Sequence, residues 1–323
     1  MNNAVLAEGL AKRFGETTAL DGVDLAARTG SVLGILGPNG AGKTTAVRIL
    51  ATLLAPDAGH AEVCGYDVAR DAHRVRQVIG LTGQYASVDE MLTGTENLLL
   101  IGRLLGQSRA EARSGARELL TRFGLADAEG RAAKTYSGGM RRRLDLAACL
   151  VGRPRVLFLD EPTTGLDPRS RLDLWQIVRD LVADGVTVLL TTQYLDEADV
   201  LADEIAVIDH GRVIATGTPQ ELKARTGVQP LVVRPSDAAD LPVVTAIVRE
   251  LTGFEPAVEG ATVTASVTDP ALLPAVVRRL DDARVTVAEL ALRSASLDEV
   301  FLSLTGHRAE EPTNTPDLER TSA

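Results

Sequence analysis

The chain has 323 residues, of which 45% are hydrophobic and only 3% aromatic, and its formal net charge is −10. This length suits one large α/β domain and one smaller domain. The acidic balance argues against nucleic acid as a general partner, because phosphate backbones are bound by basic surfaces. No apolar stretch approaches the roughly 18–20 residues that a membrane-spanning helix needs, and the N-terminus lacks the features of a secretory signal. Two cysteines are too few for a disulfide framework or a zinc site. We therefore expect a cytosolic protein, whose membrane role, if it has one, depends on another chain.

The first fifty residues carry a glycine-rich loop between a strand and a helix. Residues 1–35 are predicted to form short strands, which end in the apolar run 32–36, and residues 43–53 have the apolar spacing of a helix. Strand, glycine loop and helix form the context that a phosphate-binding loop requires. The nine residues of the loop are Gly37, Pro38, Asn39, Gly40, Ala41, Gly42, Lys43, Thr44 and Thr45.

This loop has the chemistry of a nucleotide phosphate site. Its backbone N–H groups can point inward and open onto a helix N-terminus, which favours anions. Lys43 is expected to neutralise the outer phosphates, and the Thr44 hydroxyl to bind Mg²⁺. The alternative, a glycine-rich turn of an unrelated α/β protein, is disfavoured because the pattern is complete and its context is right.

A mostly helical subdomain is predicted at about residues 87–152, where three segments have helical periodicity: 98–105, 110–123 and 144–151. Ser137-Gly138-Gly139 precedes the last of these helices and can offer a hydroxyl, two N–H groups and a helix N-terminus to a phosphate. Alone this tripeptide is a weak signal. A second anion site makes sense, however, if it serves a nucleotide held by a neighbouring subunit.

Two buried strands follow, at residues 156–159 and 186–190, and they alternate with helices at 172–182 and 196–201. Continuous apolar strands between helices indicate a largely parallel sheet that is covered on both faces. Asp160 and Glu161 come directly after the first strand. We assign to Asp160 the holding of Mg²⁺ through water, and to Glu161 the polarisation of the attacking water.

The remainder predicts the end of this domain and a smaller one. A hairpin over residues 205–215 and a capped helix from Thr218 close a nucleotide-binding domain at 1–225. Residues 228–306 then follow the order βαββαβ, which favours a small α+β ferredoxin-like domain; its segments are 231–234, 241–251, 257, 261–267, 270–280 and 284–292. A last helix covers 297–304, and residues 307–323 are expected to be disordered.

In this order the motifs resemble those of ATP-binding subunits of the ABC superfamily, over residues 5 to 222. Gln84 matches the family's Q-loop glutamine, which senses Mg²⁺ and the γ-phosphate. Thr164-Gly165-Leu166-Asp167 matches the D-loop, which crosses the dimer interface. Phe14 lies where the family places an aromatic side chain against adenine, although a lone aromatic residue could equally belong to the core. The resemblance implies a P-loop ATPase that works as a homodimer. Its expected ligands are Mg²⁺ and ATP, with GTP as an open alternative to ATP.

Three positions depart from the family pattern. Tyr136 and Met140 stand at the two ends of the signature, where Leu and Gln are usual, and Gln193 stands in place of the switch histidine. A glutamine amide can donate a hydrogen bond to the γ-phosphate but cannot carry a proton charge. We therefore expect slower or differently tuned hydrolysis. After the signature, a solvated first helical turn is the favoured interpretation of Arg141 and Arg142, whereas Arg143 aligns with a basic residue of the family.

The tail of the chain resembles the daunorubicin-resistance ATP-binding subunits, through Gln193, the C-terminal domain and the segment 297–307. The resemblance implies a peripheral protein at the cytoplasmic face of the cell membrane, where a separate permease forms the drug-export path. Contacts with that permease are expected around residues 85–96. One helical face either packs on the small domain or supports assembly; its residues are Leu297, Val300, Phe301 and Leu304.

Other functions of an ABC subunit stay open at this stage. Two other classes are separated from drug exporters only by Gln193 and the C-terminal motif: importer subunits, and exporters of lipid, haem or polysaccharide. A soluble ABC ATPase that acts on ribosomes or DNA is disfavoured, because the chain has one glycine loop, no heptad run and an acidic balance. The sequence of this chain does not identify the transported substrate.

Overall fold

The structure is a computed structural model that describes residues 2–83, 88–225, 229–269, 271–293 and 296–305. By its internal contacts the chain divides into two compact units, with the division between Pro219 and Gln220. No helix in the described part of the chain combines the length and the apolar character of a membrane span.

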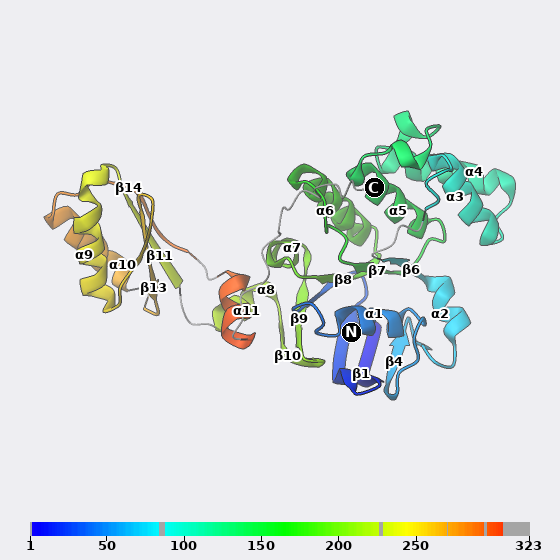
Figure 1. Cartoon of the computed structure of the whole chain (residues 1–323), viewed down its shortest axis with the longest axis horizontal. Helices are drawn as coiled ribbons and strands as arrows, with labels where there is room; N and C mark the ends of the chain where they lie inside the picture. The colour runs from blue at the N-terminus through cyan, green and yellow to red at the C-terminus, as the bar shows by residue number, and fades with distance from the viewer. Residues whose placement is uncertain (1, 84–87, 226–228, 270, 294–295, 306–323) are drawn as a thin grey trace, which may run out of the picture. The chain divides into compact units, whose positions relative to one another are not determined.

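The first unit is built on a six-stranded sheet with the order β10-β9-β3-β8-β7-β6 (Figure 1). All neighbouring strands pair in parallel except β10 and β9, which form an antiparallel hairpin. This arrangement confirms the expected, largely parallel sheet and the hairpin after it. The strands are β3 (Val32–Leu36), β6 (Ile79–Thr82), β7 (Val156–Asp160), β8 (Thr187–Thr192), β9 (Glu204–Asp209) and β10 (Arg212–Gly217).

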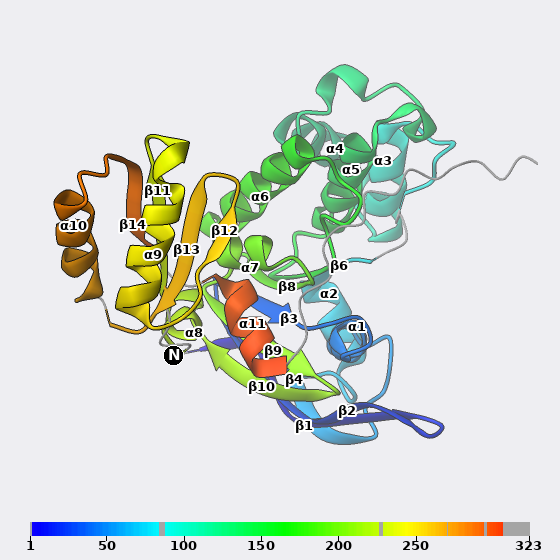
Figure 2. The same ribbon diagram turned by 60° about the vertical axis from the view of Figure 1, so that its left-hand side comes forward.

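Helices cover both faces of this sheet, and successive side chains of a strand pack into the hydrophobic cores on opposite faces. Val156 and Phe158 of β7 pack with α1 and α2, whereas Leu157 and Leu159 pack with α5, α6 and α7. Figures 1 and 2 show these two groups of helices on opposite faces. Double burial explains why the strands read as unbroken apolar runs. The five helices are α1 (Lys43–Leu50), α2 (Ala72–Val78), α5 (Gly138–Leu150), α6 (Pro168–Ala183) and α7 (Leu195–Leu201).

A second, antiparallel sheet in this unit has the order β2-β1-β4-β5. Its strands are β1 (Asn3–Phe14), β2 (Thr17–Arg28), β4 (Ala58–Val63) and β5 (Tyr66–Asp67). The prediction of short strands at the N-terminus is wrong, because β1 and β2 have 12 residues each. Their pairing shifts register between Ala7 and Leu10, where Gly9 has a φ of 60°. Such an irregularity interrupts the alternation of apolar and polar residues, so one strand reads as two.

The helices within the predicted helical subdomain are mainly α3 (Gly94–Leu104), α4 (Arg109–Arg122) and α5. Helices α3 and α4 both begin with a capping box, formed by Thr93 with Glu96 and by Ser108 with Glu111. Two 3₁₀ turns, Ala126–Ala128 and Ala133–Thr135, lead from α4 to the signature.

The second unit contains an antiparallel sheet of order β12-β13-β11-β14, against which α9 and α10 pack. The predicted order of strands and helices is confirmed. The division between the units falls after the first residue of α8 (Pro219–Arg225). The elements that follow α8 are β11 (Gln229–Pro235), the 3₁₀ turn Ala238–Asp240, α9 (Leu241–Thr252), β12 (Ala257–Glu259), β13 (Thr262–Val267), α10 (Leu272–Asp282), β14 (Val287–Leu292) and α11 (Leu297–Thr305).

Candidate nucleotide-binding and catalytic site

The glycine-rich loop connects the end of β3 to the first residue of α1 and lies against neighbouring backbone. Gly42, just before α1, has a φ of 111°, and a Cβ atom there would lie 2.4 Å from the carbonyl oxygen of Ala19 in β2. Only glycine meets both demands. Asn39 and Gly40 at the crest of the loop are exposed, whereas Gly37, Ala41 and Gly42 are buried. Thr45 is half-buried. The loop therefore has a fixed base and an open crest.

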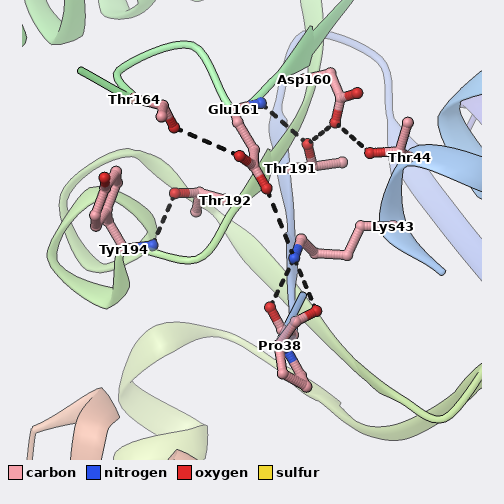
Figure 3. Close-up of polar contacts among 10 residues, drawn as sticks. Pro38, Lys43, Thr44, Asp160, Glu161, Thr164, Thr191, Thr192 and Tyr194 are labelled. Carbon is pink, nitrogen blue, oxygen red and sulfur yellow. Dashed lines mark hydrogen bonds and ion pairs between the residues drawn. The ribbon is translucent and has the colours of Figure 1, made fainter. Parts of the chain in front are cut away.

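Lys43 turns its ammonium group into this loop. The side chain is only 4% exposed, and its Nζ donates hydrogen bonds to the Gly37 carbonyl at 2.7 Å and to the Pro38 carbonyl at 3.1 Å (Figure 3). Glu161 Oε1 lies 3.9 Å from the same nitrogen. The sequence-predicted cation and the candidate base are thus brought together at one edge of the sheet.

Asp160 is the last residue of β7, and its carboxylate faces the start of α1. Its Oδ1 accepts hydrogen bonds from Thr44 Oγ1 at 3.2 Å and from Thr191 Oγ1 at 2.5 Å (Figure 3). The Thr44 hydroxyl and the Asp160 carboxylate are the hard oxygen donors that Mg²⁺ prefers. The described residues contain no group of three His, Cys, Asp or Glu side chains that could hold a metal. The two oxygen donors at this edge fit Mg²⁺, which usually takes only one or two ligands from the protein.

Glu161 is held in an unusual backbone conformation. Its φ is 50°, in the left-handed region that costs a non-glycine residue about 1–3 kcal/mol. The backbone N–H donates to the carbonyl oxygen of Thr191 at 3.0 Å and approaches the Thr191 hydroxyl at 3.2 Å. Thr164 donates a long hydrogen bond of 3.5 Å to the carboxylate. Strand β8 thus fixes the turn that directs Glu161 toward Lys43.

Sequence reasoning missed the role of Thr191, which bonds both acidic residues. Two polar residues, Thr191 and Thr192, end β8 directly after three apolar residues, and both are buried. This pattern was the available signal, because a buried hydroxyl needs a hydrogen-bond partner.

The signature and the D-loop lie at the starts of two packed helices. Ser137 caps α5 and accepts a hydrogen bond from the Met140 N–H at 3.2 Å. Asp167 caps α6, and its carboxylate accepts hydrogen bonds from the N–H and the hydroxyl of Ser170 at 3.0 and 2.6 Å. A Cβ atom on Gly139 would lie 2.4 Å from Ser170 Oγ. Ser137, Gly138 and Asp167 are exposed.

Tyr136, which departs from the family pattern, belongs to the core of the helical subdomain. Its ring is 4% exposed, and its hydroxyl donates to the Ala128 carbonyl at 2.8 Å. The change from leucine is therefore accommodated by a hydrogen bond inside the subdomain, and it leaves Ser137 at the surface.

Three further site residues were predicted: Phe14, Gln84 and Gln193. Phe14 is 52% exposed, and the Lys12 ammonium lies 5.8 Å from the centre of its ring. Gln84 lies outside the described residues, as does the beginning of the segment 85–96. Gln193 is half-buried and follows β8. Its neighbours are fixed, because the Tyr194 N–H donates to Thr192 Oγ1 at 3.0 Å and Arg171 covers the Tyr194 ring at 4.9 Å.

The interpretation of Arg142 as a solvated residue is wrong. Its Nε donates to the Pro162 carbonyl at 2.7 Å, and its Nη1 donates to the Gly83 carbonyl at 3.1 Å. The first turn of α5 faces the ends of β6 and β7 at this position, so the guanidinium enters the protein. Burial lowers its pKa, an effect that the nearby Asp145 opposes. Arg141, in contrast, is half-exposed and pairs with Glu90 at 2.8 Å. Arg143 donates to the Phe123 carbonyl at 3.2 Å.

On α11 the expected apolar face is largely buried. Leu297, Val300 and Phe301 are each at most 4% exposed. None of the three belongs to the core cluster beneath the sheet of the second unit. This leaves both interpretations of the face open, since the side chain of Leu304 lies outside the described residues.

Comparisons with known proteins identify the family of both units. Residues 20–164 match the family model of the ABC transporter, and residues 217–305 match that of the ATP-binding protein DrrA1-3-like C-terminal domain. The ATP-binding cassette of an ABC transporter, solved in its ADP conformation, superposes with a TM-score of 0.62 at 28% identity; 68% of this chain and 93% of that chain are covered. The fold and the site define an ABC transporter ATPase.

Curated relatives narrow the family. The daunorubicin resistance ATP-binding protein DrrA2 of Streptomyces coeruleorubidus is 56% identical over 95% of this chain and 96% of its own length. The daunorubicin/doxorubicin resistance protein DrrA of Streptomyces peucetius is 54% identical over 95% and 94%. The Nod factor export ATP-binding protein I of Ralstonia nicotianae is 40% identical over 94% of both chains. The chain belongs to the daunorubicin-resistance family of ABC transporter ATP-binding subunits.

Proposed function

We propose that this chain powers the export of daunorubicin-like hydrophobic drugs through a separate integral membrane permease, as a peripheral protein at the cytoplasmic face of the membrane. The observation that carries the proposal is the 54–56% identity, over nearly the whole of both chains, to proteins named for daunorubicin resistance. Export of another compound is the alternative. Nod factor export relatives are also similar along their whole length but share only 40% identity or less.

In this proposal the residues at the edge of the sheet that carries the glycine-rich loop bind and hydrolyse ATP, or GTP. Lys43 neutralises the outer phosphates, and Glu161 accepts a hydrogen bond or the proton from the attacking water. Thr44 and Asp160, with Gln84, would hold Mg²⁺, which supplies positive charge to the phosphate oxygens. Gln193 donates a hydrogen bond to the γ-phosphate.

A second copy of the chain completes the site. Ser137, Gly138 and Gly139 of one subunit, together with Asp167, meet the nucleotide that the other subunit holds, and Phe14 stacks on its base. The exposure of Ser137, Gly138, Asp167 and the Phe14 ring supports this assignment. ATP binding closes the homodimer, and hydrolysis opens it. Nucleic acid has no part in this cycle.

We assign residues 1–225 to the nucleotide-binding domain and 228–306 to an accessory domain for assembly. The strand order β12-β13-β11-β14, with two helices packed against the sheet, supports a ferredoxin-like fold for the accessory domain.

We assign the contact with the permease to residues 85–96 and to a groove of about 640 Å³ between α2, β6 and α3. Two leucines at its rim, Leu104 and Leu105, are 78% and 56% exposed. Exposed apolar residues around a groove are typical of surfaces that meet a partner.

Drug accumulation tests the proposal. We expect that deletion of the gene in its native host raises intracellular daunorubicin fluorescence. Wild-type protein restores efflux, whereas the Lys43→Ala variant does not. Unchanged accumulation of daunorubicin and of a panel of other hydrophobic antibiotics, with loss of export of a lipid, haem or a polysaccharide, would replace the drug by that cargo.

A further inference from the structure

The carboxyl group of Glu197 is buried beside the residues that follow β7 and end β8. Glu197 in the first turn of α7 has no exposed surface, and its Oε1 accepts a hydrogen bond from Trp175 Nε1 of α6 at 3.1 Å. The side chains of Thr192 and Thr163 also lower the pKa of this carboxyl group, so both lie beside it. Among the described residues, the buried Glu197 Oε2 and Thr163 Oγ1 are both without a well-formed hydrogen bond.

Burying this carboxyl group costs free energy of folding, because the group is removed from water. Burial raises the pKa of Glu197, although the side chains of Thr192, Trp175 and Thr163 lower it in part. Burial therefore favours the neutral acid, whose O–H can donate a hydrogen bond. A leucine of similar volume would avoid the desolvation cost. Buried groups with shifted pKa values are common at functional sites, where their geometry is used.

The neighbours of Glu197 belong to the two segments that carry the proposed catalytic groups. Thr163 lies two residues after Glu161, and the Pro162 carbonyl between them accepts a hydrogen bond from Arg142. Thr192 directly follows Thr191, which holds both Asp160 and Glu161. Gln193 comes next in the chain. The carboxyl group is thus the common neighbour of both segments.

We propose that Glu197 is a positioning residue, which fixes Thr163 and Thr192 relative to each other and so keeps Glu161 and Gln193 directed at one phosphate. This inference rests on the proposed roles of Glu161 and Gln193. Because Glu161 has a left-handed backbone, it keeps this conformation only where its surroundings hold it. Without the carboxyl group, the segment at Thr163 relaxes and the Glu161 side chain moves away from the attacking water.

Three variants of the full-length chain test this role: Glu197→Gln, Glu197→Leu and the double variant Glu197→Leu with Trp175→Phe. The glutamine keeps an acceptor for Trp175 and gains a donor, so kcat stays within about threefold of wild type. Both leucine variants lose at least about tenfold in kcat, because small misplacements of a catalytic group cost up to about a hundredfold. The KM for ATP and the affinity for a fluorescent ATP analogue stay within about twofold.

The double variant removes the buried donor together with its acceptor, so no indole N–H is left unpaired, and any fall in its melting temperature reports the smaller ring alone. Asp199→Asn, an exposed change on the same helix, is the matched control and keeps the wild-type kcat. A folded leucine variant with wild-type kcat overturns the inference. So does a parallel fall of kcat, ATP affinity and melting temperature, which assigns a purely structural role.

Glu161→Gln is measured beside these variants. If it hydrolyses ATP normally, the proposed role of Glu161 fails and the inference fails with it. If it is inactive while both leucine variants are fully active, only the inference about Glu197 fails.

Discussion

The two halves of the nucleotide site in one chain differ in how completely the chain itself assembles them. The first half consists of the glycine-rich loop with Asp160 and Glu161. Within it, Lys43 and Asp160 are each 4% exposed and bonded to neighbouring groups. In the signature half, Ser137, Gly138 and Asp167 are exposed, and the polar side chains cap their own helices. The first half is preorganised by folding, whereas the second is a surface that meets the nucleotide of the other subunit in the proposed dimer. We therefore expect mutations in the two halves to separate nucleotide binding from turnover.

The largest effect is expected at Glu161, the residue proposed to accept a hydrogen bond or the proton from the attacking water. Glu161→Gln keeps the shape of the side chain and the left-handed turn but removes the proton acceptor. Turnover should fall by about 10²- to 10⁴-fold, the usual contribution of a general base. ATP binding should persist and trap a dimer, because closure precedes the lost step. Phosphate release measures the turnover, and size-exclusion chromatography with ATP measures the dimer.

Glu118→Gln, an exposed change on α4, controls for loss of charge and should behave as wild type. If Glu161→Gln hydrolyses ATP at the normal rate, another group activates the water.

A pair of alanine substitutions sharpens the comparison between the halves. At Gly42 a Cβ atom would meet the Ala19 carbonyl at 2.4 Å in a left-handed backbone, so Gly42→Ala should weaken nucleotide binding by about 10- to 100-fold. At Gly138 a Cβ atom would meet nothing within 4 Å in the single chain. Gly138→Ala should therefore fold and bind nucleotide normally, yet lose at least about tenfold in turnover, because close backbone approach to a phosphate needs glycine.

Equilibrium binding of a fluorescent ATP analogue and steady-state hydrolysis distinguish the two variants. Full turnover by Gly138→Ala, with a rate per molecule that does not change on dilution, would mean that no second subunit meets the signature.

The local parts of the site could be predicted from the sequence, because they follow one another along the chain. The glycine loop stands between its own strand and helix, and Asp160 and Glu161 end a strand whose apolar run is unmistakable. Short-range order also located the hairpin, the helical subdomain and the order of elements in the second unit. In each case the signal and the structure share the same ten or twenty residues.

The parts that sequence reasoning missed depend on contacts between distant segments. Arg142 follows an exposed signature, yet it reaches the carbonyls of Gly83 and Pro162, 59 and 20 residues away. Glu197 looks like one of several acidic residues in the predicted helix 196–201, but it shares the buried face of α7 with Leu195, Ala198 and Leu201. A charge on an apolar face was the signal for Glu197. For Arg142 no local pattern distinguishes its guanidinium, which bonds inside the protein, from that of its half-exposed neighbour Arg141.

The smallest effect is expected at Gln193, which belongs to neither half alone because it follows β8 and faces the γ-phosphate in the proposed cycle. Its backbone is fixed on both sides by the Thr192–Tyr194 hydrogen bond and by Arg171 over the Tyr194 ring, so Gln193→His should leave the fold unchanged. An imidazole donates the same hydrogen bond and can also carry a proton, so the variant should hydrolyse ATP at least as fast as wild type. Its turnover should also gain a pH dependence between about pH 6 and 7 that the glutamine does not provide. Hydrolysis rates across this pH range check both points. A collapse in turnover would show that this site depends on the amide and that Gln193 is more than a substitute for histidine.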